Sequence, residues 1–155
     1  MTVKSYSKPL EQADESAKEL IIEVLTGEHT YGFDIDSIYY YESEDKWVVL
    51  EFLKCDHKTV RPSKSHPKRY WGMNWRKFAS LWRLAQSLGG VLLLVNYEDQ
   101  EHAETQGRTE REFCVIRVDD MDPSESGGIT KEKVAVGDFA WFKKWFQDLN
   151  ARGAK

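Results

Sequence analysis

Residues 33–56, FDIDSIYYYESEDKWVVLEFLKCD, decide the fold of this chain. Within them, residues 38–41 are rich in strand-forming side chains, and Ser43-Glu44-Asp45 is typical of a turn. The nearly unbroken apolar run 47–53 predicts a central, buried strand. The stretch therefore predicts a hairpin whose second strand lies in the interior of a sheet.

Four charged residues interrupt this apolar hairpin: Asp34, Asp36, Glu51 and Lys54. Charges in a core strand are unfavourable unless they are paired, hydrogen-bonded or bound to a metal, although solvation at the strand ends is the simpler interpretation. Two carboxylates on adjacent strands are able to hold a hard divalent cation such as Mg²⁺ or Mn²⁺. With a nearby lysine, a metal and a water, such a site is suited to phosphodiester hydrolysis.

The segments that flank the hairpin complete a pattern of helices and strands. An apolar stripe at helical spacing predicts a helix over 13–26. After the hairpin, a second helix is predicted from an Asn74 N-cap to Leu88, followed by the apolar strand 91–95. A strand, a helix and a strand in this order predict two parallel strands joined by a right-handed crossover.

The rest of the chain adds a loose arm, loops, one more strand and a final helix. In chain order these are the arm 1–11, the charged loop or hairpin tip 98–111, the strand 113–118, the loop 119–128 and a helix capped by Asp138. We assign no function to the two loops. The order predicts one α/β domain over 1–155, with a central mixed sheet flanked by helices, a motif region at 13–96 and a C-terminal strand and helix within 112–150.

Composition limits the class of protein. With 155 residues, of which 41% are hydrophobic, the chain is long enough for one domain with a proper core. No apolar run approaches the length of a membrane span, and the start lacks an apolar signal segment, so we expect a cytoplasmic protein. Cys55 and Cys114 suffice for neither a zinc site nor a disulfide framework and are predicted to be buried thiols.

Positive charge is concentrated in one segment, residues 54–83. This segment holds nine Lys and Arg and one acid, a net charge of +8, whereas the other 13 basic and 25 acidic residues give −12. The segment predicts a face that binds nucleic acid, with a solvated loop as the alternative. The predicted contacts are Lys58, Arg61, Lys64, Lys68, Arg69 and Arg76.

Aromatic and histidine residues are interleaved with these charges. Tyr70, Trp71 and Trp75 are candidates for stacking on bases, although core packing is the preferred interpretation for at least one tryptophan. His57 and His66 are candidate acid–base or phosphate-binding groups, although solvated loop histidines are more common.

The order of elements, together with Asp36, the sequence Glu51-Phe52-Leu53-Lys54 and the later FASLWRLAQSLGGVLLLV, resembles the PD-(D/E)XK nuclease superfamily. The pattern is nearest to its Holliday-junction-resolvase-like and Mrr-like branches. The resemblance implies a restriction-endonuclease-like fold and a Mg²⁺- or Mn²⁺-dependent endonuclease acting on DNA, with RNA as the alternative substrate. It implies Asp36 and Glu51 as metal ligands and Lys54 as the catalytic lysine. By analogy alone, a homodimer is expected.

Further acids have alternative roles within this resemblance. Asp34 is the other candidate for the Asp role. Glu23, or with less support Asp14, resembles an acid that some members carry on the first helix.

The spacing of Glu51 and Lys54 departs from the family, which usually places one residue between them. On a regular strand these two side chains point to opposite faces. Three explanations remain open: a β-bulge near Phe52 realigns them, Lys58 or another basic residue of the following loop takes the lysine role, or the site has decayed. A decayed protein would bind nucleic acid or a protein partner through 54–83, or serve as a protein-interaction module.

Overall fold

The structure is a computed structural model that describes residues 16–28 and 30–153. The chain forms two compact units, Met1–Phe33 and Asp34–Lys155. The first contains α1 (Ser16–Leu25), which is the described part of the helix predicted over 13–26; the predicted arm and Asp14 lie outside the described residues. No helix in the described ranges has both the length and the apolar character needed to cross a membrane.

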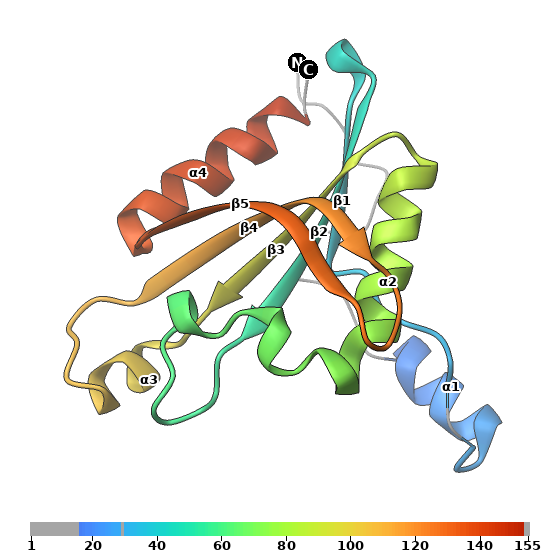
Figure 1. The fold of residues 1–155 in the computed structure, drawn as a ribbon, viewed down its shortest axis with the longest axis horizontal. Helices are drawn as coiled ribbons and strands as arrows, with labels where there is room; N and C mark the ends of the chain where they lie inside the picture. The colour runs from blue at the N-terminus through green and yellow to red at the C-terminus, as the bar shows by residue number, and fades with distance from the viewer. Residues whose placement is uncertain (1–15, 29, 154–155) are drawn as a thin grey trace. The chain divides into compact units, whose positions relative to one another are not determined.

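The second unit is built on a five-stranded mixed sheet, which confirms the predicted α/β class (Figure 1). The strands lie in chain order across the sheet. They are β1 (Ser37–Tyr41), β2 (Lys46–Lys54), β3 (Val91–Tyr97), β4 (Glu112–Asp122) and β5 (Gly128–Asp138). The β2–β3 pair is parallel and the other three pairs are antiparallel.

The predicted hairpin is confirmed. Strands β1 and β2 pair antiparallel from Tyr41 opposite Lys46 to Ser37 opposite Leu50. The turn between them contains a short 3-10 helix, Glu42–Glu44, and Asp45 in the left-handed conformation, with φ of 46°. The Tyr40 hydroxyl donates to Asp45 Oδ1 at 2.7 Å and fastens this turn. The polar turn residues thus close the hairpin where the sequence places them.

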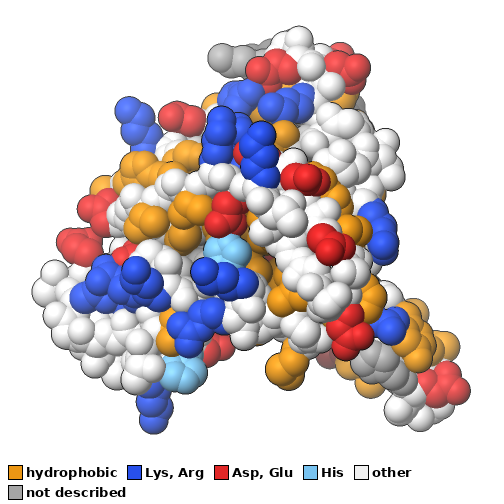
Figure 2. Space-filling view, viewed as in Figure 1, with side chains coloured by type: hydrophobic (Ala, Val, Ile, Leu, Met, Phe, Trp, Pro, Cys, Tyr) orange, Lys and Arg blue, Asp and Glu red, His pale blue; other side chains and the backbone are white. Residues whose placement is uncertain are grey.

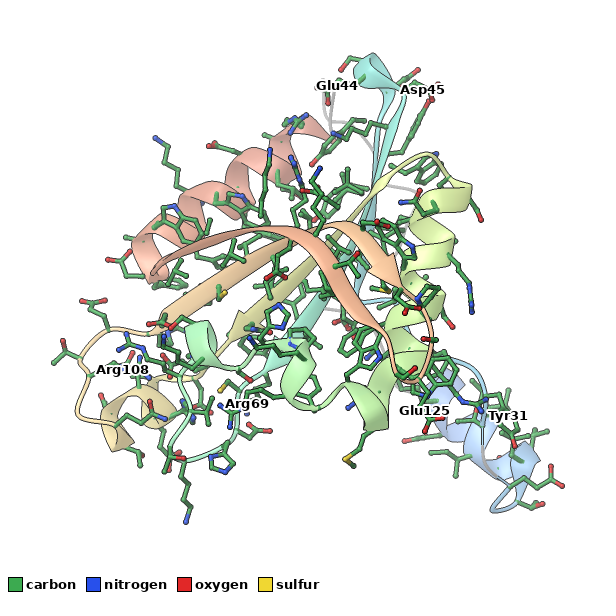
Figure 3. The ribbon with its side chains drawn as sticks, viewed as in Figure 1. Tyr31, Glu44, Asp45, Arg69, Arg108 and Glu125 are labelled. Atoms are coloured by element: carbon green, nitrogen blue, oxygen red, sulfur yellow. The ribbon has the colours of Figure 1, made fainter. Side chains whose placement is uncertain are left out.

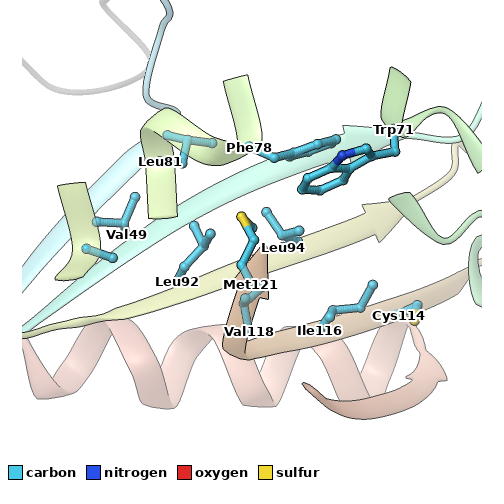
Figure 4. Packing of buried hydrophobic residues seen from close by; sticks show 11 residues of the cluster. Val49, Trp71, Phe78, Leu81, Leu92, Leu94, Cys114, Ile116, Val118 and Met121 are labelled. Atoms are coloured by element: carbon cyan, nitrogen blue, oxygen red, sulfur yellow. The ribbon is translucent and has the colours of Figure 1, made fainter. Parts of the chain in front are cut away.

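Helix α2 (Trp71–Ser87) forms the crossover from β2 to β3 and covers one face of the sheet (Figure 1). Its apolar side chains join those of β2, β3 and β4 in one buried cluster, in which Phe78 lies over Leu94 (Figure 4). The predicted Asn74 N-cap is wrong, because the helix begins three residues earlier, at Trp71. Trp71 is buried in this cluster, and its indole N–H donates to the distant Ser124 carbonyl at 2.9 Å, so a tertiary contact holds the first turn ahead of the residue that favours a cap.

Helix α4 (Phe139–Arg152) covers the opposite face of the sheet. The predicted Asp138 cap is confirmed, since its side chain accepts a hydrogen bond from the Trp141 amide at 2.9 Å. The aromatic side chains of α4 belong to the core: the Phe142 ring stacks on Phe113 at 4.4 Å and lies 5.9 Å from the Phe146 ring.

The polar C-terminal half contains more regular structure than the sequence predicts. The predicted loop 98–111 contains helix α3 (Gln100–Thr105), and strand β4 continues to Asp122, through the first four residues of the predicted loop 119–128. Strand β5 was not predicted. Its exposed charged residues, among them Lys131 and Lys133, hide the strand pattern, and such charges are typical of the edge strand that it forms.

Candidate functional site

Asp36 and Glu51 lie next to each other where β1 begins against β2. The register places Ser37 opposite Leu50, so that the residue before β1 lies beside Glu51. Asp36 Oδ2 accepts a hydrogen bond from the Phe52 amide at 2.7 Å. The hairpin therefore anchors one oxygen of the exposed Asp36 carboxyl to the backbone of β2 and holds this carboxyl beside that of Glu51.

Glu51 is buried in the middle of the sheet, with an exposed fraction of 2%. It lies between Val49 and Leu53 on the face that α2 covers. Its Oε1 pairs with Nζ of Lys77, which extends from α2. Its Oε2 is buried and has no hydrogen-bond partner among the described residues. An unsatisfied carboxylate oxygen in the interior is costly, so Glu51 is an unusual residue for this position in the sheet.

The surroundings of Glu51 favour its neutral form. Burial raises the pKa of the Glu51 carboxyl, and the adjacent Asp36 carboxylate raises it further. The Lys77 ammonium acts in the opposite direction, yet the pKa remains above the ordinary value of 4.5. A divalent cation at this position would add the positive charge that the two carboxylates lack.

Lys54 does not reach this group. The register of β2 with β3 runs without a break from Val48 to Lys54, so the realigning bulge near Phe52 is absent from a strand that the structure describes throughout. Lys54 consequently points to the face opposite Glu51. Its Nζ lies 3.4 Å from Asp99 Oδ2 and 3.8 Å from Asp56 Oδ1. Lys54 therefore belongs to a surface ion-pair cluster at the end of β2.

Lys77 is the lysine that the structure brings to Glu51, and the sequence reasoning missed it. The sequence indicates only that Lys77 belongs to the basic segment, because this lysine lies on a predicted helix, 26 residues after Glu51. A signal was available: Lys77 is one turn before Leu81 and directly before Phe78, so it borders the buried stripe of α2. A lysine on the border of a core-facing stripe is placed to reach a buried carboxylate by extending its long side chain.

The two additional acids occupy different units. Glu23 lies on α1 in the first unit, and Asp34 lies two residues before Asp36 in the segment that leads into β1. Their roles remain predictions.

The predicted nucleic-acid contacts divide into two groups. Arg61 is held by Glu112, with Nε 2.6 Å from Oε2, and so has a structural role. The other five lie on the exposed connection between β2 and α2 or on the first turns of α2, with Arg69 labelled in Figure 3. Within the described ranges none of these five forms an ion pair: Lys58, Lys64, Lys68, Arg69 and Arg76.

The aromatic residues of this segment also divide. Trp71 is part of the core, as preferred for one of the tryptophans, and its indole N–H donates to the Ser124 carbonyl at 2.9 Å. Tyr70 is partly buried against the same cluster, and this burial raises the pKa of its hydroxyl to about 12. Trp75 is partly buried and carries the Arg76 guanidinium 5.2 Å from its ring centre. Trp75 with Arg76 is therefore the remaining candidate for stacking on a base.

The two candidate histidines differ in their partners. His66 Nε2 lies 2.7 Å from Glu132 Oε2 and ties the basic connection to β5. His57 remains exposed, and its ring nitrogen accepts from the Thr59 amide at 3.3 Å.

A buried ion network explains the charges of residues 98–111. Glu98 is fully buried, and its carboxylate accepts from Arg108 Nη2 and pairs with His102 Nδ1, each at 2.6 Å. Its Oε2 also accepts from the Glu112 amide at 2.7 Å. The other His102 ring nitrogen lies 2.7 Å from the His57 carbonyl oxygen. Figure 3 shows Arg108 beside α3, where the network ties α3 and β4 to the connection after β2.

This network predicts a pH-dependent stability. Burial lowers the pKa of His102, but its hydrogen bonds to Glu98 and to the His57 carbonyl outweigh burial and raise it above 6.5. A raised pKa means that the folded protein holds the proton more tightly than the unfolded chain does. His102→Gln should therefore lower the free energy of unfolding by about 2 kcal/mol below pH ~6.5, and the difference should shrink as the pH rises through the folded pKa.

Urea denaturation of wild type and His102→Gln across this pH range measures the effect. His57→Gln is the matched control, because the side chain of His57 is exposed and only its backbone carbonyl belongs to the network. If the difference in free energy of unfolding between wild type and His102→Gln grew with pH, protonated His102 would not be the form that stabilises the network.

The candidate site is therefore a pair of carboxylates with one lysine. The described residues contain no group of three or more His, Cys, Asp or Glu able to hold a metal ion. Two carboxylates are nevertheless a usual protein contribution to a Mg²⁺ site, because this ion keeps several waters and binds substrate phosphate oxygens. Comparison of the chain with protein-family models, curated proteins and solved structures finds no match to any of them.

Proposed function

We propose that this protein is a Mg²⁺- or Mn²⁺-dependent nuclease of restriction-endonuclease-like type that hydrolyses phosphodiester bonds in DNA. One observation carries the proposal: the buried Glu51 carboxylate, with an unpartnered oxygen, lies beside Asp36 and is paired with Lys77. Buried carboxylates with perturbed pKa values are typical of functional sites. A sheet that needed only stability would be served better by an apolar residue at this position.

Each of the three residues has a defined part. Asp36 and Glu51 would hold the cation, Asp36 with the oxygen that does not accept from the Phe52 amide and Glu51 with Oε2. When bound, the cation supplies Lewis-acid polarisation of a phosphoryl oxygen and a lower pKa for a bound water. Lys77 donates hydrogen bonds to the attacking water or to a phosphate oxygen and offsets the charge that develops on phosphorus-bound oxygens.

The basic connection between β2 and α2 would hold the substrate. Its four Lys and Arg residues without ion pairs, together with Arg76 on α2, neutralise phosphates and give an affinity that falls with salt and depends little on base sequence. It follows directly on the strand that carries Glu51 and leads into the helix that carries Lys77. Figure 2 shows Lys and Arg side chains gathered on the visible face over this part of the second unit.

Asp36→Asn tests the metal-dependent activity. Wild type should cleave DNA with Mg²⁺ or Mn²⁺ and not with EDTA, and the substitution should reduce the rate by about 100-fold, because loss of even an outer-shell partner of a metal costs 10–100-fold. Plasmid DNA, single-stranded DNA and RNA serve as substrates. The substitution keeps the size of an exposed side chain and leaves an oxygen for the Phe52 amide, so folding should be retained.

Asp34→Asn is the matched comparison, since it makes the same change two residues upstream and tests the other candidate for the Asp role. Full activity in this variant assigns the role to Asp36. Absence of metal-dependent cleavage by wild type on all three substrates overturns the nuclease. DNA binding that then persists and weakens with salt would favour the alternative, a non-catalytic protein that binds nucleic acid through the basic connection.

A further inference from the structure

The face of the sheet opposite Glu51 carries an open cleft of about 450 Å³, which we call the α4 cleft. It lies between the C-terminal half of α4 and the strands β2 to β5. Val48 and Leu93 form part of its floor and belong to the core on the α4 side. Strand alternation places Glu51 on the other side, so the cleft is separate from the candidate nuclease site. Its volume is in the range of sites for small organic ligands.

The α4 cleft combines an apolar interior with a cationic rim. Apolar side chains from the sheet line the floor, and Trp145 and Leu149 form the wall on α4. The charged lining residues are Lys46, Arg117, Lys133, Arg152 and Asp148. This set has a net charge of +3, although the chain as a whole carries −4. In Figure 2, Lys and Arg side chains gather over the C-terminal part of α4.

Two of the four cations already have partners. Arg117 Nε lies 2.8 Å from Asp119 Oδ1, and Arg152 Nη2 lies 2.5 Å from Glu44 Oε2. Lys46 and Lys133 form no ion pair or hydrogen bond through their side chains with any residue in the described ranges. These two lysines are therefore available to a ligand.

The pairing of β4 with β5 places two positive charges next to each other at the rim, and a negatively charged group there would reduce their repulsion. Arg117 is directly opposite Lys133 in the antiparallel register, and both line the cleft. Like charges directly opposite each other on neighbouring strands destabilise a sheet. The Asp119 carboxylate attracts both cations, but it forms an ion pair only with Arg117. An anionic ligand group beside Lys133 would give this lysine an ion-pair partner.

We propose that the α4 cleft binds a small organic acid with an apolar body, an aliphatic or aromatic carboxylate. The apolar body lies on the sheet floor against Trp145, and the carboxylate is held at the rim by Lys133 beside Arg117. An inorganic anion would leave the apolar floor exposed to water, and an uncharged apolar molecule would leave the cationic rim uncompensated. The cleft matches a ligand that combines both properties.

Octanoate is the probe, with acetate and 1-octanol as matched comparators that keep only its charge or only its apolar body. Calorimetric titration should show octanoate binding at least about tenfold more tightly than either comparator. Lys133→Gln should weaken octanoate binding by about tenfold, the usual effect of losing one hydrogen bond to a charged group. Lys143→Gln, which makes the same change on α4 outside the cleft, should leave it unaltered.

A second variant fills the cleft. Ala135→Trp places a large ring on the exposed edge strand β5 within the lining and should abolish octanoate binding while the thermal unfolding temperature stays close to that of wild type. Asp36→Asn should bind octanoate as wild type does, so the outcome is independent of the nuclease. Absence of octanoate binding, equal binding of octanol or acetate, or insensitivity to both Lys133→Gln and Ala135→Trp would overturn the proposal.

Discussion

Lys77→Met should reduce metal-dependent DNA cleavage by about 1,000-fold, whereas Lys54→Met should change it by less than about threefold. The difference follows from the geometry: Lys77 pairs with the buried Glu51, while Lys54 lies on the opposite face and pairs with Asp99 and Asp56. Removal of a group that donates to the water or to phosphate removes stabilisation realised in the transition state. Single-turnover cleavage rates of the two variants under identical metal and salt conditions measure this difference.

Lys77→Arg is the informative control within the site. It keeps the positive charge but changes the shape and number of donors, so it should retain only part of the activity. Circular dichroism and DNA binding of all variants separate a loss of chemistry from a loss of fold or affinity. The opposite pattern, with Lys54→Met inactive and Lys77→Met active, would return the lysine role to Lys54 and refute the role proposed for Lys77.

Removal of Lys77 should also destabilise the protein, by about 3 kcal/mol at neutral pH. Glu51 is 2% exposed, and the side chain of Lys77 is 31% exposed, so the variant Lys77→Met leaves an unpaired carboxylate in the interior. The double variant Glu51→Gln with Lys77→Met removes that charge and should recover most of the lost free energy of unfolding. Urea denaturation of the four proteins of this cycle measures the coupling between the two residues.

The pH dependence of this cycle has a defined sign. Burial raises the pKa of Glu51 in the folded protein, and in Lys77→Met the lysine no longer opposes that shift. Between the unfolded and the folded pKa of Glu51, the folded state of Lys77→Met binds a proton that the unfolded chain releases. The loss of free energy of unfolding caused by the substitution is therefore complete above the folded pKa and disappears as the pH falls toward the unfolded value of about 4.5. The gap between wild type and Lys77→Met should therefore narrow on acidification. A gap that is constant with pH, together with a double variant as unstable as Lys77→Met, would show that Lys77 contributes packing and not charge.

Local sequence patterns determined most of the elements of the second unit. The hairpin follows from an apolar run, a polar turn and a strand-forming run that are adjacent in sequence, and it brings Asp36 next to Glu51 with no help from distant residues. The parallel crossover follows from the order of strand, helix and strand. The final helix begins at Asp138 because its cap is a local hydrogen bond.

Elements with weak local patterns were missed or misplaced. Strand β5 contains charged side chains that an edge strand tolerates, and only its pairing with β4 makes it a strand. Cap preference places the start of α2 at Asn74, whereas the helix begins at Trp71, whose buried indole donates to the Ser124 carbonyl. In both cases a contact with residues distant in the sequence outweighs the structure that local sequence favours.

The acidic half of the candidate site follows from local sequence alone. Asp36 and Glu51 are charges in a core hairpin, and the pairing of two neighbouring strands is enough to bring them together. Which lysine joins them was decided only by the tertiary structure. The unbroken alternation of β2 sends Lys54 to the far face, and the crossover lays α2 over Glu51 with Lys77 on the border of its buried stripe. A buried carboxylate takes the cation that the fold places within its reach, whatever their separation in sequence.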